Sequence, residues 1–125
     1  MIGNNVVLDS NILIYLSKGE LEFKELAAGY DNVFISVISY MEALGYEFKN
    51  NVEKALIEKL LASLEIVQTD IEIANLVIVY RKLKKIKTPD AIILATARKL
   101  NADLITVNMD DFFGLDCSVR IINPL

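Results

Sequence analysis

Short β-branched runs alternate with segments of helical periodicity along the whole chain, and this alternation limits the folds open to it. Apolar or β-branched runs predict strands at 6–8, 32–37, 65–69 and 102–108, and a weaker edge strand at 118–124. Helical periodicity predicts helices between them, at 12–16, 20–29, 39–48, 51–64 and 71–85, and from residue 88 onward. Strands that alternate with helices form a mostly parallel sheet covered on both faces. The predicted fold class is therefore α/β, a three-layer sandwich with a mostly parallel central sheet.

The size and composition of the chain predict one domain with a tightly buried core. It has 125 residues, of which 54% are hydrophobic, and we expect residues 1–125 to form a single domain. No apolar run reaches the roughly 18–20 residues that cross a bilayer, and Asp9 comes before any long apolar stretch. We therefore expect neither a membrane span nor a signal peptide. The apolar excess should instead fill the core and leave an apolar surface for a partner.

The chain contains no histidine and a single cysteine, Cys117. Histidine-dependent triads and dyads, imidazole-bound zinc and an internal disulfide are therefore excluded, and the lone cysteine is consistent with a reducing cytoplasm. Any catalysis must use carboxylates, lysine, tyrosine or a metal ion. Because the formal net charge is −4, binding of nucleic acid would require a local basic patch.

Acidic and amide side chains gather where the predicted strands end or where the following helices begin. In parallel α/β sheets, functional groups collect beyond the carboxyl ends of the strands. The side chains placed in this way are Asp9, Glu42, Asp90, Asn108, Asp110 and Asp111. We expect several of them to meet at one edge of the sheet.

Helix capping is an alternative role for Asp90. Thr88 suits an N-cap, and Pro89 suits the first helical position, where a backbone N–H would lack a partner anyway. Asp90 would then lie in the first turn, where the helix dipole favours a negative charge by roughly 0.3–1 kcal/mol.

Capping roles are also open to the other acids. Asp9 would precede a helix capped by Ser10 or Asn11, and Glu42 would form an S-x-x-E capping box with Ser39. Capping does not explain why three acids should gather at one edge, because like charges repel by about a few kcal/mol per close pair at an effective dielectric near 20.

A cation between the acids would relieve this repulsion. A donor set of carboxylate and amide oxygens suits Mg²⁺ or Mn²⁺ rather than zinc. Such sites activate water and neutralise a phosphodiester during its hydrolysis. Asp90 is then both a dipole-matched helix residue and a predicted metal ligand.

Four stretches of the chain resemble the PIN domain family in their order and spacing. They are "VVLDSNILIYL", "ISVISYMEALGY", "KTPDAIILATARKLNADLITVN" and "DDF". The resemblance covers nearly the whole chain, is most specific in "TPDAIILATA" followed by "ADLIT", and is strongest to the toxin ribonucleases of VapBC toxin–antitoxin pairs. It implies a PIN-like fold and a Mg²⁺-dependent endoribonuclease, with Mn²⁺ as the alternative ion. It also implies an RNA substrate such as tRNA, a homodimer, and an antitoxin partner whose peptide blocks the cleft.

The resemblance also implies roles for individual residues. Asp9, Glu42 and Asp90 match the three acids of the family's Mg²⁺ site, with Asp9 and Asp90 holding the metal and Glu42 assisting. The supporting polar residues that match beside them are Ser10, Asn11 and Thr106.

The fourth acid is where this sequence departs from the family pattern. Many relatives carry aspartate in a T-x-D position, where this chain has Asn108. Asp111, which follows in "DDF", is a candidate substitute, although it could also cap the short turn "DFFG". We expect Asn108 to support the site and Asp111 to lie near it as the fourth catalytic acid.

Five positive charges immediately precede Asp90 in the segment "RKLKKIK". A solvated helix end would account for them, but beside a metal site they would also hold RNA phosphates beyond the scissile bond. The predicted RNA-backbone residues are Arg81, Lys82, Lys84, Lys85 and Lys87.

Two other classes of function are alternatives to the endoribonuclease. If the altered fourth position left the site inactive, the chain would be a PIN-like module that binds RNA or a partner protein. A phosphoacceptor signalling domain would require an acidic pair at the first strand and a lysine after the last central strand, and the chain has neither. We therefore predict an endoribonuclease, with the inactive binding module as the alternative.

Overall fold

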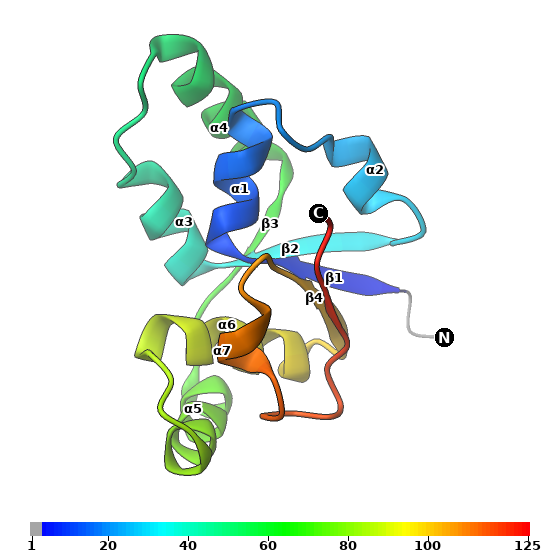
Figure 1. Cartoon of the computed structure of the whole chain (residues 1–125), viewed down its shortest axis with the longest axis vertical. Helices are drawn as coiled ribbons and strands as arrows, with labels where there is room; N and C mark the ends of the chain where they lie inside the picture. Colours follow the sequence, from blue (N-terminus) through cyan, green and yellow to red (C-terminus); the bar gives the residue numbers. More distant parts are fainter. Residues whose placement is uncertain (1–3) are drawn as a thin grey trace.

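The computed structural model describes residues 4–125, which form a five-stranded sheet with helices on both faces (Figure 1). The strand order is β3-β2-β1-β4-β5, and each neighbouring pair is parallel. The strands are β1 (Asn5–Leu8), β2 (Asn32–Ser36), β3 (Glu65–Val67), β4 (Ala102–Ile105) and β5 (Ile121–Ile122). The predicted α/β sandwich is confirmed.

Two groups of helices cover the two faces of the sheet (Figure 1). One group contains α1 (Ser10–Ser17), α2 (Phe23–Ala27), α3 (Val37–Leu44) and α4 (Asn51–Ser63). The other contains α5 (Ile71–Leu83), α6 (Thr88–Lys99) and α7 (Met109–Phe112). Within the part of the chain that the structure describes, every helix is too short or too polar to span a bilayer.

The central strand β1 is buried on both sides, as a strand between two layers of helices must be. Val7 packs into the core beneath α5 and α6, whereas Val6 and Leu8 pack into the core beneath α1 and α4. This division follows from the alternation of side chains along a strand. Beyond the last paired residues, the Asp9 N–H donates to the Ile105 carbonyl at 3.0 Å, so the pairing of β1 with β4 fixes where Asp9 leaves the sheet.

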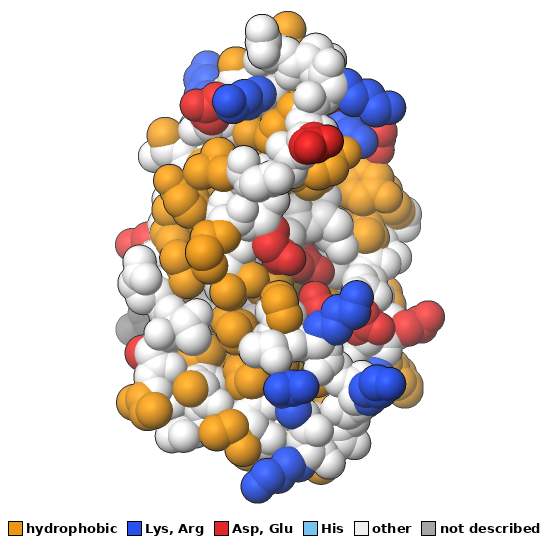
Figure 2. Space-filling model, turned by 90° about the vertical axis from the view of Figure 1, so that its left-hand side faces the viewer, with side chains coloured by type: hydrophobic (Ala, Val, Ile, Leu, Met, Phe, Trp, Pro, Cys, Tyr) orange, Lys and Arg blue, Asp and Glu red, His pale blue; other side chains and the backbone are white. Residues whose placement is uncertain are grey.

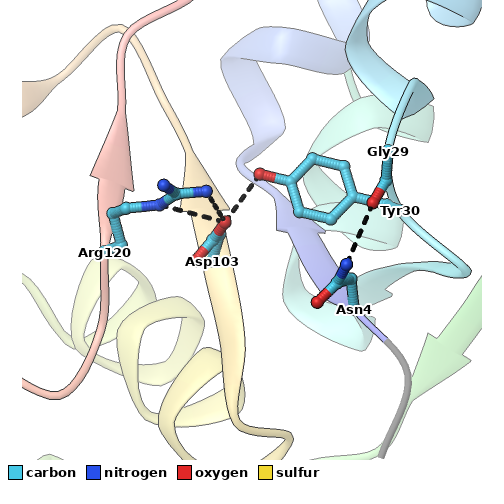
Figure 3. A network of polar contacts seen from close by, with 5 residues as sticks. All are labelled: Asn4, Gly29, Tyr30, Asp103 and Arg120. Carbon is cyan, nitrogen blue, oxygen red and sulfur yellow. Dashed lines mark hydrogen bonds and ion pairs between the residues drawn. The ribbon is translucent and has the colours of Figure 1, made fainter.

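A polar network joins the amino ends of the strands, at the edge opposite Asp9 (Figure 3). The Tyr30 hydroxyl donates to Asp103 Oδ2 at 2.7 Å, and Arg120 Nη2 donates to the same oxygen at 2.7 Å. Asn4 Nδ2 donates to the Gly29 carbonyl at 3.3 Å. These bonds connect the segments that lead into β1, β2 and β5 with β4, so the sheet is held at this edge by side chains as well as by its ladders.

The first helix starts earlier than its capping pattern suggests. It begins at Ser10, and Asp9 is its N-cap, with Asp9 Oδ1 accepting a hydrogen bond from the Ser10 N–H at 2.7 Å. The prediction of a cap at Ser10 or Asn11 was therefore wrong. The physical reason is that β1 passes into α1 through a single residue, so the acid at the strand end is also the cap.

The same direct passage occurs between β2 and α3. Ser36 ends the strand and caps the helix, because its hydroxyl accepts a hydrogen bond from the Ile38 N–H at 3.1 Å. The helix therefore begins two residues earlier than the predicted 39–48 and ends at Leu44. The predicted capping box of Ser39 and Glu42 was wrong, since both residues lie inside the helix.

Other boundaries also move. The helix predicted at 20–29 is shortened to α2, and the strand predicted at 102–108 ends with β4 at Ile105 because the chain turns into α7. At α6, Lys87 holds the N-cap position and Thr88 is the first helical residue, with no cap bond from the Lys87 side chain within residues 4–125. The N-cap prediction for Thr88 was wrong by one position, while Asp90 lies in the first turn as expected.

Candidate active site

Asp9 is a buried carboxylate at the carboxyl end of the central strand, with 4% of its surface exposed. Its Oδ2 accepts a hydrogen bond from the Thr106 hydroxyl at 2.6 Å, and its Oδ1 accepts the bond from Ser10 that caps α1. Burial raises the pKa of this carboxyl above its ordinary value, the two hydrogen bonds lower it, and the charges of Glu42 and Asp111 raise it. Asp9 is therefore held in one orientation in a strongly negative environment.

Glu42 reaches the same edge from the middle of α3. Its Oε1 accepts a hydrogen bond from the Ser10 hydroxyl at 2.6 Å, and that hydroxyl also lies 3.1 Å from Ser39 Oγ. Ser10 follows Asp9 directly, so one residue orients the Glu42 carboxylate with its side chain and Asp9 with its backbone. The packing of α1 against α3 brings these elements together.

Asp90 enters from the first turn of α6 and is half-buried. Its pKa rises from 3.8 to about 6, chiefly because burial disfavours the charged form and then because of the charges on Asp9, Asp111 and Glu42. The positive charge of Lys87 lowers the pKa. The repulsion among acids that the sequence predicted is therefore present in the fold.

A chain of hydrogen bonds connects Asp9 with the fourth position. Thr106 is fully buried, and its hydroxyl donates to Asp9 and accepts from the Asn108 N–H at 3.0 Å. Asn108 Nδ2 in turn donates to Asp111 Oδ2 at 2.6 Å. The N-cap position of α7 belongs to Asn108 and Asp111 lies within the helix, so the alternative role of Asp111 as a cap of the "DFFG" turn was wrong. Asp110, the neighbouring acid, is exposed and stands outside these hydrogen bonds.

Four acids from four parts of the chain thus share one edge of the sheet: Asp9, Glu42, Asp90 and Asp111. Figure 2 shows acidic side chains in the middle of one face of the molecule, with lysine and arginine side chains beside them. The polar residues predicted to support the acids are adjacent to them as well, because Ser10, Asn11, Thr106 and Asn108 all take part in hydrogen bonds at this edge.

The donor set at this edge suits a hard divalent cation with much of its water retained. Among residues 4–125, no three acidic or thiol side chains stand close enough to enclose an ion directly. Mg²⁺ commonly binds through one or two carboxylates and keeps several waters. Two protein ligands, Asp9 and Asp90, match this coordination. Asn11 gives a second indication, since its amide Nδ2 lies 3.5 Å from Asp9 Oδ2 while its Oδ1 is buried without a hydrogen-bond partner in the described chain. A buried acceptor of this kind is rare, and an ion-bound water would satisfy it.

The basic segment divides into two kinds of side chain. Arg81, Lys82, Lys85 and Lys87 are exposed, in line with a surface that could contact phosphates. The Lys84 ammonium instead donates to the backbone carbonyls of Asp110 and Phe113, which belong to α7 and its C-cap. No pattern in the sequence predicts this contact, because Lys84 is one of several lysines in the "RKLKKIK" run.

Comparison with known proteins agrees with this fold. The PIN domain family model matches residues 6–114, and the chain therefore belongs to the PIN domain family. The resemblance inferred from the sequence is confirmed. A search of curated proteins finds no match.

Solved structures of toxin–antitoxin complexes contain chains of the same fold. A chain in a toxin–antitoxin complex from Klebsiella pneumoniae is 33% identical, with 96% of this chain and 98% of that chain covered and a TM-score of 0.80. Chains in VapBC2 from Rickettsia felis, bound to a promoter DNA fragment, and in DNA-bound VapBC from Salmonella typhimurium give TM-scores of 0.76 and 0.75. Their identities are 21% and 22%, each match covers 95% of this chain, and 98% and 97% of those chains are covered.

The raised pKa of Asp90 predicts how stability depends on pH when divalent ions are removed. The carboxyl titrates near 6 in the folded protein and at an ordinary 3.8 when unfolded, so folding favours its protonated form. As the pH rises from about 4 to about 6, the wild type should therefore lose stability relative to Asp90→Asn, and the difference should remain constant at higher pH. Urea unfolding in EDTA across this range measures the difference. Parallel stability curves for the two proteins would contradict the prediction.

Proposed function

We propose that this chain is the nuclease toxin of a toxin–antitoxin pair, a metal-dependent endoribonuclease that hydrolyses phosphodiester bonds in RNA. The observation that carries the proposal is the convergence of Asp9, Glu42, Asp90 and Asp111 at the carboxyl edge of the sheet. Like charges gathered in a partly buried site are unfavourable alone and become favourable when they bind a cation. Membership of the PIN domain family and the similarity to a chain of a toxin–antitoxin complex support the same conclusion.

Asp9 and Asp90 are the residues that would hold the ion, Mg²⁺ or Mn²⁺. Such an ion lowers the pKa of water and neutralises charge that develops on the phosphodiester. The bonds from Thr106 and Ser10 keep Asp9 in place, so little rearrangement is needed to present its carboxylate. A cation beside Asp90 would favour its ionised form and offset the effect of burial.

Glu42 would act on the attacking water. Its Oε1 accepts a hydrogen bond from the Ser10 hydroxyl, and this bond orients the carboxylate. The residue as a whole is exposed at the edge of the site. Its second carboxylate oxygen can then accept a proton from water as the water oxygen bonds to phosphorus and the phosphorus–oxygen bond to the leaving nucleotide breaks, the leaving oxygen taking a proton from solvent. Asn108 and Asp111 would complete the site, the first through an amide dipole and the second through a full charge.

The substrate would follow the exposed basic residues away from the acids. Arg81, Lys82, Lys85 and Lys87 lie on the segment that leads directly into the first turn of α6, where Asp90 stands. Contacts with phosphates fix the register of a nucleic acid without reading its sequence, so these residues would hold RNA beyond the scissile bond.

An antitoxin is the proposed protein partner, and the reaction would take place in the cytoplasm, where a free exposed Cys117 stays reduced. The α3 helix that carries Glu42 also exposes Met41 and Leu44, which are 56% and 39% exposed. Exposed apolar side chains on the helix that bears Glu42 are a surface to which an apolar segment of the antitoxin could bind.

The altered fourth position favours one alternative, an inactive PIN-like module that binds RNA or a partner. Asn108 is neutral, so the site carries one charge fewer than a site with aspartate there. Calorimetric titration with Mg²⁺ separates the two functions, because an inert module should bind the ion no better than its Asp9→Asn variant does.

Loss of either primary carboxylate should abolish RNA cleavage. Asp9→Asn and Asp90→Asn should each remain folded and fail to cut total RNA in Mg²⁺, and chelator should stop the wild type. Asp110→Asn is a matched control, because this exposed acid lies at the same edge but outside the network, and it should keep most of its activity. Full activity in either of the first two variants, or cleavage in excess EDTA, would rule out the mechanism.

The fourth position can be tested by changing one charge at a time. Asp111→Asn should reduce cleavage almost as much as Asp90→Asn, because Asp111 supplies the charge that Asn108 lacks. Asn108→Asp should lower the Mg²⁺ concentration needed for half-maximal rate, since it adds a carboxylate within reach of the ion. The measurement is the cleavage rate against Mg²⁺ concentration, and unchanged curves for both variants would place both residues outside the site.

We also propose that the chain forms a homodimer through the outer face of α5. This face exposes Ile71, Ile78, Val79 and Leu83 by 77%, 53%, 51% and 67%, an unusual amount of apolar surface for one helix. Sedimentation at micromolar concentration should show a dimer, and Ile78→Lys should shift it toward the monomer. Val52→Lys, at an apolar residue of α4 that is 70% exposed, is the control and should leave the dimer intact.

A further inference from the structure

The short helix α7 carries Asp111 but has little of its own to hold it in place. It contains four residues, Met109–Phe112, and so short a helix is unstable unless other parts of the fold fix it. Phe112 is fully buried and anchors one side of α7 in the core beneath α6. Its position along the edge of the sheet must be fixed by other contacts.

Lys84 supplies such a contact from the end of α5. Its ammonium donates to the Asp110 carbonyl, and to the Phe113 carbonyl at 3.3 Å. Carbonyl groups at the end of a helix lack intrahelical partners and carry partial negative charge, so a lysine there satisfies them and complements the dipole. Because Asp111 lies between these two carbonyls in the sequence, Lys84 holds the backbone on both sides of it.

A second set of contacts fixes the chain just after α7. The Tyr80 hydroxyl, one turn before Lys84, donates to Asp116, and Arg98 Nη1 from α6 donates to Asp116 Oδ1 at 2.7 Å. The Lys84 N–H also donates to the Tyr80 carbonyl at 3.1 Å, so the contacts of Lys84 and of Tyr80 come from the same helix end. The segment that presents Asp111 is thus tied to the last turn of α5 at two points.

We propose that Lys84 is a positioning residue that holds Asp111 at the acidic site, and that it does not bind RNA phosphates with the rest of the basic segment. The inference rests on the proposed function in that it treats Asp111 as the fourth acid. Its consequence is specific: loss of Lys84 should weaken the response to metal, whereas loss of an exposed neighbouring lysine should weaken RNA binding.

Lys84→Met and Lys85→Met form a matched pair, since each removes one positive charge from adjacent positions while Lys85 is exposed and Lys84 is half-buried. In Lys84→Met, the Mg²⁺ concentration for half-maximal cleavage and the calorimetric dissociation constant for Mg²⁺ should rise about threefold to tenfold, below the roughly 10–100-fold loss seen for direct partners of metal ligands. Its affinity for RNA, measured by anisotropy in EDTA so that the RNA is not cut, should stay within about twofold of wild type. Lys85→Met should lower the affinity for RNA and leave Mg²⁺ binding unchanged. Lys84→Arg, which keeps the positive charge, should bind Mg²⁺ as the wild type does.

Amide hydrogen exchange tests the contacts of Lys84 with the backbone of α7 without reference to nuclease activity. Residues 109–113 should exchange faster in Lys84→Met than in the wild type, and Lys85→Met should leave their exchange unchanged. Failure of the wild type to cut RNA would overturn the proposed function, while exchange and Mg²⁺ calorimetry would still decide the role of Lys84. Unchanged exchange and Mg²⁺ affinity in Lys84→Met, or a loss of RNA affinity alone as in Lys85→Met, would overturn the positioning role.

Discussion

Asp9 is 4% exposed, and a buried negative charge is costly unless hydrogen bonds or a cation compensate for it. The fold supplies the hydrogen bonds from both sides of β1, since Ser10 follows it in the chain and Thr106 follows the paired strand β4. This arrangement requires β1 and β4 to be parallel and in register, so that both ends emerge together. The Thr106 hydroxyl also accepts a hydrogen bond from the Asn108 N–H, so the turn into α7 is connected to the same buried carboxylate.

Without a bound cation, the acids at this edge lower the stability of the fold. Burial, and then the charges of three neighbouring acids, raise the pKa of Asp90 to about 6, which means that ionising it opposes folding at neutral pH. The neutral Asn108 limits this repulsion, because an acid there would add another charge beside Asp111. If Asp111 supplies the fourth charge, as proposed, the neutral Asn108 makes the site depend on the position of Asp111. Contacts from α5, and not α7 alone, hold the segment that carries it.

Patterns that depend on one segment at a time predicted the fold well. The alternation of strand and helix, and the rule that acids gather beyond strand ends, predict that Asp9, Glu42 and Asp90 lie at one edge, and the structure brings them together there. The capping predictions failed, because a strand that passes directly into a helix makes its last residue the cap, as at Ser36. The partner of Lys84 could not be predicted at all, since its acceptors are backbone carbonyls more than twenty residues away and carry no sequence signal.

To bind RNA as proposed, a protein with a net charge of −4 and a cluster of acids needs a local positive field. At physiological salt the field of an exposed charge decays over about 8 Å, so attracting groups are useful only close to the site. The connection between α5 and α6 meets this requirement, because it runs into the turn that bears Asp90. The same connection also supports α7, because Lys84 turns inward to backbone carbonyls of that segment. Lys85 remains in solvent, where the proposed contact with RNA would be made. Positive charges in a basic run are therefore not interchangeable, and the acceptor that each one meets in the fold determines what its loss would change.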